Sequence, residues 1–126
     1  MTPAIAAFLA EPHIATLTTM RPGGTPHVVP VRFSWDHAAR LARVLTVATS
    51  RKARSVAADP GGPAVLCQPD GFRWATLEGT VTISADPTRI AAAVGRYTAR
   101  YRTPPPHPPG RVVLEIAVDR VRTLNL

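Results

Sequence analysis

The sequence predicts a single domain of the mainly β class over residues 1–126, a mostly antiparallel barrel with a few short helices. Three observations support this fold. Most apolar segments alternate with a period of two, which is the spacing of a strand with one buried face. Turn residues rather than helices separate most of these segments, which favours antiparallel pairing over a doubly wound sheet. A chain of 126 residues fits one domain and leaves no room for separate cofactor and substrate domains.

The first third of the chain predicts a short helix and then a hairpin. Thr2-Pro3 is a good cap and first helical position, so we expect a helix over residues 3–10. Residues 13–20 and 26–35 are rich in strand-forming residues and flank a Pro-Gly-Gly turn, so both are expected to be strands. Alternation in the second strand puts Val28, Pro30, Arg32 and Ser34 on one face, and on the other Val29, Val31, Phe33 and Trp35.

The middle of the chain predicts two strands around a second short helix, followed by a long strand. Residues 41–49 and 63–68 have strand composition, whereas residues 50–58 change to a helical period. Residues 72–85 are expected to form the long strand, with alternate apolar residues facing inward. Gly79 falls on that inward face, where a bulge or a close approach of another backbone is expected.

The last third predicts an amphipathic helix, a rigid loop and a final strand. Asp86-Pro87 is a strong helix start, and the residues that then recur at helical spacing over about four turns are Ile90, Val94, Tyr97 and Tyr101. Residues 103–110 hold five prolines and are expected to be a rigid loop. Residues 111–118 alternate again and are expected to form the last strand.

The charge balance favours anionic ligands. The formal net charge is +7, from 15 Lys and Arg against 8 Asp and Glu, and Lys52 is the single lysine. The preference for Arg, together with abundant Ala and Pro, is typical of a GC-rich genome, but the excess of cations remains. We expect no nucleic-acid partner, because the arginines are scattered from Arg21 to Arg122 without a basic stripe or a recognition helix.

Several other classes of protein and site are not expected. No apolar run approaches the ~20 residues that span a bilayer, and the N-terminus lacks the basic segment of a signal peptide. Cys67 has no disulfide partner in the chain, which makes a reducing cytoplasm the default location. Ser50 has no evident base, so no catalytic residue is identified. No metal site is expected either, because no metal-ligand spacing occurs among His13, His27, His37 and His107.

The most informative segment is the strand-to-helix turn at residues 45–54. Unpaired N–H groups at a helix start and the helix dipole favour an anion there. Arg can hold two phosphate oxygens at once, and Lys acts as a point charge, so the turn is a candidate phosphate site. By spacing alone, the plainer alternative is favoured, a capped surface helix whose cations are solvated. The polar residues of the segment are Thr46, Thr49, Ser50, Arg51, Lys52 and Arg54.

A second candidate is the strand around Pro30. Proline removes a hydrogen-bond donor from the ladder, so an edge position or a bulge is the default interpretation. The functional alternative is that the strand bends there and offers backbone amides to a flat ring. Trp35 and Trp74 are more readily explained as core or interface residues than as stacking platforms.

Taken in order, these segments resemble the pyridoxamine 5′-phosphate oxidase-like split β-barrel family of flavin and deazaflavin proteins. The resemblance covers nearly the whole chain, from about Phe8 to Leu124. It implies a homodimer with a cofactor site at the subunit interface and a small-molecule acceptor. The segments that carry it are His13-Ile14-Ala15-Thr16-Leu17, Gly24 to Phe33, Thr46 to Arg54 with Asp59-Pro60, Leu77-Glu78-Gly79-Thr80-Val81, and Val113-Leu114-Glu115-Ile116.

The resemblance also assigns roles to individual residues. It implies that the cofactor phosphate is surrounded by Thr46, Ser50, Arg51 and Lys52. It implies that the tricyclic ring lies along the backbone of Val29, Pro30, Val31, Arg32 and Phe33. Trp74 aligns roughly where relatives that bind flavin mononucleotide (FMN) use a polar phosphate contact, and a tryptophan departs from that pattern.

The short form of the chain is similar to the actinobacterial branch that binds coenzyme F420. That branch implies a reductase that transfers a hydride from the reduced deazaflavin to a conjugated acceptor, such as an enone, a quinone or a tetrapyrrole. Arg32 and Arg54 are candidates for holding the oligoglutamate tail of the coenzyme. An FMN-dependent oxidoreductase of the same fold and a non-enzymatic cofactor carrier remain alternatives. Pyridoxamine oxidation is not expected, because the residues that would hold pyridoxal phosphate are not recognisable.

Overall fold

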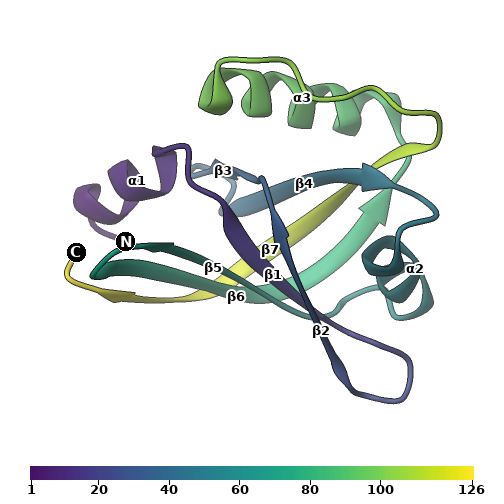
Figure 1. Ribbon diagram of the computed structural model, residues 1–126, viewed down its shortest axis with the longest axis horizontal. Helices are drawn as coiled ribbons and strands as arrows, with labels where there is room; N and C mark the ends of the chain where they lie inside the picture. Colours follow the sequence, from purple (N-terminus) through teal and green to yellow (C-terminus); the bar gives the residue numbers. More distant parts are fainter.

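Seven strands form one curled antiparallel sheet, flanked by three helices, in a computed structural model that describes residues 1–126 (Figure 1). None of the three helices has the length and apolar character that crossing a bilayer requires. The elements in chain order are α1 Pro3–Ala10, β1 Ala15–Met20, β2 Pro26–Val31, β3 Ser34–Asp36, β4 Leu41–Val47, α2 Arg51–Ala58, β5 Gly62–Asp70, β6 Arg73–Ser84, α3 Pro87–Tyr101 and β7 Arg111–Leu124.

The strand order leaves the barrel open on one side. The order is β2-β1-β5-β6-β7-β4-β3, and every neighbouring pair is antiparallel, which confirms the predicted mostly antiparallel split barrel. Strand β2 pairs only with β1, and the short β3 pairs with β4 only up to Arg43. From Val44 to Val47, strand β4 therefore pairs only with β7. The free edge of β2 and this part of β4 border the split.

The core fills the inside of the curled sheet and is closed at one end by α1. Alternate residues of β1, β5 and β6 are buried, as the period-two pattern predicts. Phe8 and Leu9 bring α1 onto this core and are both almost completely buried. Burying a side chain of that size stabilises the fold by roughly 1.5–3 kcal/mol. Thr2 caps α1 by accepting a hydrogen bond from the Ile5 amide at 3.2 Å, as its sequence position predicts.

The strand predicted over residues 26–35 is interrupted, which corrects that prediction. The alternation holds for Val31 and Phe33, which are buried, but beyond them Ser34 is buried and Trp35 is only partly buried. The cause is a contact from α3. The Phe33 amide donates to the Tyr101 hydroxyl at 3.1 Å, and that hydroxyl also lies 3.2 Å from the Phe33 carbonyl oxygen. The backbone leaves the ladder there and resumes in β3.

Polar contacts hold α3 over β4 and β7. Ala93 is its only buried residue, whereas Arg89 forms an ion pair with Glu115 at 2.6 Å and Arg96 with Asp36 at 3.0 Å. Because α3 covers this part of β7, Glu115 is buried there. The last strand also runs on to Leu124, beyond the predicted end at Val118.

The long strand β6 bends at Gly79, as predicted. The register between β6 and β7 shifts between Glu78 and Gly79. A Cβ atom at Gly79 would lie 1.9 Å from the Ala117 carbonyl oxygen, so no other residue fits without moving the backbone. The bulge is therefore part of how the sheet curls.

We predict that Gly79→Ala lowers the free energy of unfolding by about 2 kcal/mol or more, because the added methyl group would overlap the β7 backbone. Gly95→Ala is the control, since Gly95 is exposed on α3 with no atom near its Cβ position. That variant should gain about 0.5–1 kcal/mol in helix propensity. Urea unfolding of both variants measures the difference, and equal stabilities would contradict the close approach.

Candidate functional site

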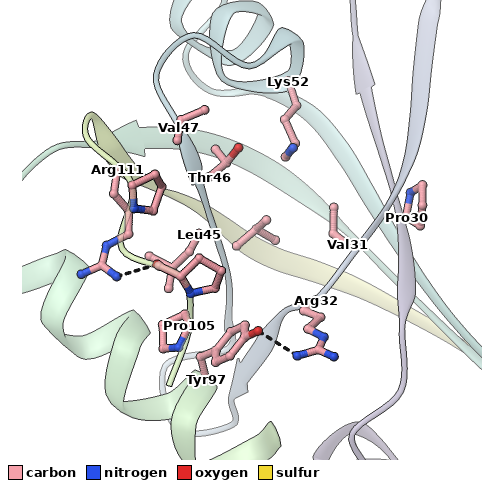
Figure 2. Close-up of a pocket in the computed structure, with 13 residues that line it drawn as sticks. Pro30, Val31, Arg32, Leu45, Thr46, Val47, Lys52, Tyr97, Pro105 and Arg111 are labelled. Atoms are coloured by element: carbon pink, nitrogen blue, oxygen red, sulfur yellow. Dashed lines mark hydrogen bonds between the residues drawn. The ribbon is translucent and has the colours of Figure 1, made fainter. Parts of the chain in front are cut away.

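A cavity of about 340 Å³ lies at the split in the barrel (Figure 2). Its walls come from the end of β2, the part of β4 that pairs only with β7, the start of α2, Tyr97 of α3 and the proline-rich loop before β7. A wider groove of about 640 Å³ runs between α3 and that loop, but it includes none of the residues predicted to bind the cofactor. The cavity at the split is therefore the candidate site.

Five residues predicted to bind the cofactor line this cavity together. They come from two segments that are far apart in the sequence, the end of β2 and the β4–α2 turn. Pro30 lies on the edge strand β2, so the edge position expected for a proline and a place beside a ligand are compatible here. The five residues are Pro30, Val31, Arg32, Thr46 and Lys52.

The other predicted residues lie around or away from the cavity. Val29 packs against the core, and the Phe33 side chain is buried in it. Thr49 is exposed in the turn before α2, and Ser50 is the N-cap of that helix. The side chains of Arg51 and Arg54 are exposed on α2. Trp74 pairs with Leu124 at the start of β6, at the end of the sheet away from α2 (Figure 1).

The start of α2 is arranged by two hydroxyl groups. Ser50 Oγ accepts a hydrogen bond from the Ala53 amide at 3.2 Å and another from Thr46 Oγ1 at 3.0 Å. The amides of Arg51 and Lys52 donate to no other group of the protein. Two free N–H groups at a helix start, beside a lysine, form a local environment that attracts an anion.

Three cations around the cavity have no acidic partner. Lys52, Arg32 and Arg111 take part in none of the ion pairs of the chain, and no Asp or Glu lines the cavity. Burial lowers the pKa of Lys52, because its ammonium group is partly removed from water. Arg111 donates to the Pro106 carbonyl at 3.0 Å, while its buried Nε has no partner. These unsatisfied donors fit a phosphate-bearing group.

The positive region extends from the cavity to the β1–β2 hairpin. Burial lowers the pKa of His27, and the nearby charges of Arg21, Arg51 and Lys52 lower it further. The buried His27 Nδ1 atom has no hydrogen-bond partner. Burial and the three nearby cations all disfavour the protonated form of the His27 imidazole.

Sequence reasoning did not place two important residues in the site. Arg111 reaches the cavity because it is the first residue of β7, opposite Val47 at the end of β4. Its position directly after the proline-rich loop was the available signal. Tyr97 belongs to the helical repeat of α3, and such a repeat alone does not distinguish a side chain that faces the core from one that lines a pocket. Tyr97 lines the cavity.

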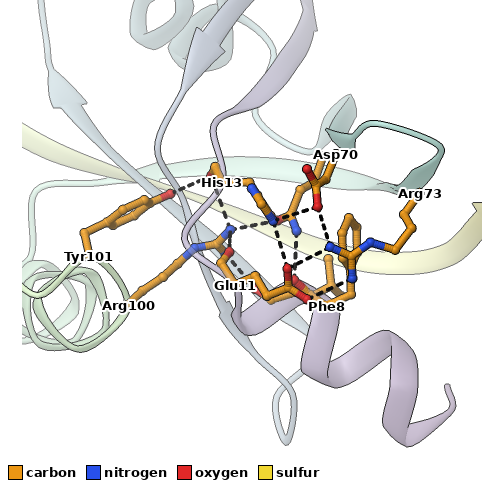
Figure 3. Close-up of polar contacts among 9 residues, drawn as sticks. Phe8, Glu11, His13, Asp70, Arg73, Arg100 and Tyr101 are labelled. Atoms are coloured by element: carbon orange, nitrogen blue, oxygen red, sulfur yellow. Dashed lines mark hydrogen bonds and ion pairs between the residues drawn. The ribbon is translucent and has the colours of Figure 1, made fainter.

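A second polar cluster lies at the far end of the barrel and is structural (Figure 3). Glu11, His13 and Asp70 place possible metal-ligand atoms within 4.8 Å of one another. Arg73 already occupies this cluster, with Glu11 Oε1 2.9 Å from its Nη2 atom and an ion pair to Asp70. The hydrogen bond from Arg73, followed by that from His13, lowers the pKa of Glu11. The carboxylates are thus engaged in tying α1 to the β5–β6 hairpin.

Comparison with known proteins identifies a family and similar structures for this chain. The family model described as pyridoxamine 5′-phosphate oxidase matches residues 1–125. The chain is 49% identical over 115 residues to the F420H2-dependent biliverdin reductase of Mycobacterium tuberculosis, covering 91% of this chain and 82% of that protein.

Two solved structures are also similar. One is a conserved hypothetical protein of Mycobacterium tuberculosis, with a TM-score of 0.78 and 25% identity, covering 98% of this chain and 84% of that one. The other is described as an F420 reductase, with a TM-score of 0.73 and 27% identity, covering 92% and 94%. The family match over residues 1–125 includes both segments that line the cavity.

We predict that Glu11→Gln reduces the loss of stability in acid. The pKa of Glu11 is lower in the folded protein than its ordinary value of 4.5, so its stabilising effect is present above that value and is lost as the pH falls through the folded pKa. The variant lacks this contribution, and its free energy of unfolding should therefore fall less steeply between about pH 5 and pH 3.

Glu78→Gln is the matched control, because Glu78 lies outside the Glu11 cluster and has a single ion pair, with Arg122 at 3.6 Å. Urea unfolding across the acid range compares the three proteins. If the two variants follow the same pH dependence, the Glu11 cluster does not contribute as described.

Proposed function

The chain belongs to the pyridoxamine 5′-phosphate oxidase family, and we propose that within it the protein is a coenzyme F420-dependent reductase of a conjugated tetrapyrrole such as biliverdin. The relative with 49% identity carries that activity in its name, and a structural neighbour is described as an F420 reductase. The observation that carries the proposal is the cavity at the split, where Lys52 and the free amides of α2 meet two unpaired arginines without any carboxylate.

The residues at the start of α2 suit the phosphate of the coenzyme. Lys52 contributes a full charge, and the amides of Arg51 and Lys52 contribute two directed donors. The Ser50 hydroxyl accepts two hydrogen bonds and keeps its own hydrogen for a ligand oxygen. A phosphate oxygen there would compensate charges that no group of the chain compensates. The cap expected in the alternative interpretation is confirmed, because Ser50 caps α2, and in this proposal the same hydroxyl would also contact the phosphate.

The remaining walls suit a flat ring. Val31 and Leu45 supply apolar surface from opposite sides of the split, and the prolines of the loop before β7 supply a rigid wall. The free edge of β2 supplies backbone groups that no other strand pairs with. Such a cavity holds a planar group in one orientation and keeps water away from it.

The chemistry divides between the coenzyme and the chain. When bound, the reduced deazaflavin supplies a hydride to the conjugated acceptor. The residues of the chain bind and orient the two molecules and exclude water. No carboxyl or imidazole group lines the cavity, so we expect solvent water at its open side to supply the proton that the reduced product takes up.

A homodimer is part of the proposal. Three large apolar side chains, Ile14, Val28 and Phe72, are 50%, 58% and 88% exposed. Val28 lies on the edge strand β2, next to the cavity, so a second subunit that covers it would also cover the mouth of the cavity. Sedimentation of the purified protein at several concentrations tests the assembly, and a monomer throughout would contradict it.

FMN is the alternative cofactor, because it also carries a phosphate on a tricyclic ring system. The phosphate site alone does not distinguish the two. Fluorescence titration of the protein with coenzyme F420 and with FMN, separately and in competition, separates them. Tighter binding of FMN, with FMN-dependent reduction of the acceptor, would replace the F420 proposal with the alternative.

We predict that Lys52→Ala weakens coenzyme F420 binding about tenfold or more, since a hydrogen bond to a charged group contributes roughly 1.5–3 kcal/mol. Lys52→Arg should retain most of the affinity because the charge remains. Arg120→Ala is the matched control for net charge, since Arg120 is exposed on β7 and makes no ion pair. The dissociation constant from fluorescence titration is the readout. An unchanged value for Lys52→Ala would remove the phosphate assignment.

A further inference from the structure

We propose that Arg32 binds a carboxylate of the acceptor, at the end of the cavity away from Lys52. This inference rests on the proposed function, because it names the acceptor as an anionic, carboxylate-bearing molecule. It goes further by assigning the recognition to one side chain and by separating the anion site of the acceptor from that of the coenzyme.

Arg32 is not used by the fold. Other arginines form ion pairs with buried or half-buried carboxylates, among them Arg43 with Asp36 and Arg89 with Glu115. Arg32 has no acidic partner, and the one hydrogen bond of its side chain goes from Nη1 to the Tyr97 hydroxyl at 2.9 Å. A guanidinium group has five N–H donors, so most of them remain free at the edge of the cavity.

Two tyrosines hold this guanidinium group in place. Its central carbon lies 4.9 Å from the ring centre of Tyr101 and 5.9 Å from that of Tyr97. The two rings are 4.8 Å apart, and the Tyr101 hydroxyl is fixed by contacts with His13 and Phe33. Cation–π contact and the hydrogen bond to Tyr97 thus orient Arg32 before any ligand arrives. An oriented guanidinium group loses less entropy when it binds a carboxylate in a bidentate manner.

The position of Arg32 favours the acceptor over the tail of the coenzyme. Figure 2 shows Lys52 and Arg32 on opposite sides of the cavity, with Val31 between them and Thr46 beside Lys52. Along the coenzyme, the phosphate separates the ring from the oligoglutamate tail. If Lys52 holds the phosphate, a residue on the far side of the cavity neighbours the ring and the molecule that the ring reduces. Arg51 and Arg54, on α2, are the arginines adjacent to the phosphate end.

The test combines a change in the protein with a change in the ligand. Biliverdin carries two propionates, and its dimethyl ester keeps the conjugated system without the charges. Absorbance titration measures the equilibrium binding of biliverdin and of its dimethyl ester, with and without coenzyme F420. The proteins compared are the wild type, Arg32→Gln, Arg32→Lys, Tyr97→Phe and the control Arg120→Gln. Steady-state kcat and KM are measured for the same set, and thermal unfolding shows whether each variant is folded.

We expect Arg32→Gln to weaken binding of the diacid about tenfold or more and to leave the diester unaffected. In the kinetic measurements, Arg32→Gln should raise the KM for the diacid and leave kcat unchanged, because the contact is made equally in the ground state and in the transition state. Arg32→Lys should restore part of the affinity. Tyr97→Phe should give a smaller rise in KM for the diacid, since Tyr97 only positions Arg32. Affinity for coenzyme F420 should be unchanged in Arg32→Gln.

Three results would overturn the inference. Equal losses for diacid and diester would show that Arg32 does not bind a carboxylate of the acceptor. Weaker binding of coenzyme F420, but not of its analogue without glutamates, would assign Arg32 to the tail instead. Unchanged diacid binding in Arg32→Gln would exclude any contact. Because ligand binding is measured without turnover, failure of the F420 proposal would appear separately, as absent coenzyme binding in the wild type.

Discussion

The site depends on positive charge that the fold places in a partly closed opening and leaves without acidic partners. Lys52, Arg111 and Arg32 surround the cavity, whereas no carboxylate lines it, and Glu11, Asp36 and Glu115 are engaged in ion pairs elsewhere. Removing the ammonium group of Lys52 partly from water is unfavourable, as its lowered pKa indicates. An anion that enters the cavity relieves this cost, so the free protein is prepared for a negatively charged ligand.

The architecture explains how these charges stay in place. The backbone leaves the ladder at Phe33, which separates β2 from β3 and opens the barrel between β2 and β4. The same contact with Tyr101 fixes the platform under Arg32. Ion pairs from Arg89 to Glu115 and from Arg96 to Asp36 hold α3 on the sheet, and the same helix carries both tyrosines. The same contacts therefore stabilise the fold and position the residues of the site.

Local rules were enough to predict the elements that depend on neighbouring residues. The cap at Ser50, the bulge at Gly79 and the amphipathic pattern of α3 each follow from a short segment. Contacts between distant segments were not predictable in this way. Tyr101 interrupts a strand 68 residues earlier, and the buried Glu115 depends on its cover by α3. Family resemblance grouped Trp74 with the cofactor residues, but in the single chain it lies at the other end of the sheet.

The central claim is that the ammonium group of Lys52 binds the anion of the coenzyme, and proton uptake on binding tests it most directly. The pKa of Lys52 is lowered in the free protein, and a bound anion raises it again. At a pH between the pKa of Lys52 in the free protein and its pKa in the complex, the complex holds more protons than the free protein. Calorimetric titration of coenzyme F420 in buffers of different ionisation enthalpy should show proton uptake at alkaline pH that Lys52→Gln lacks. Equal proton uptake by both proteins would contradict the account.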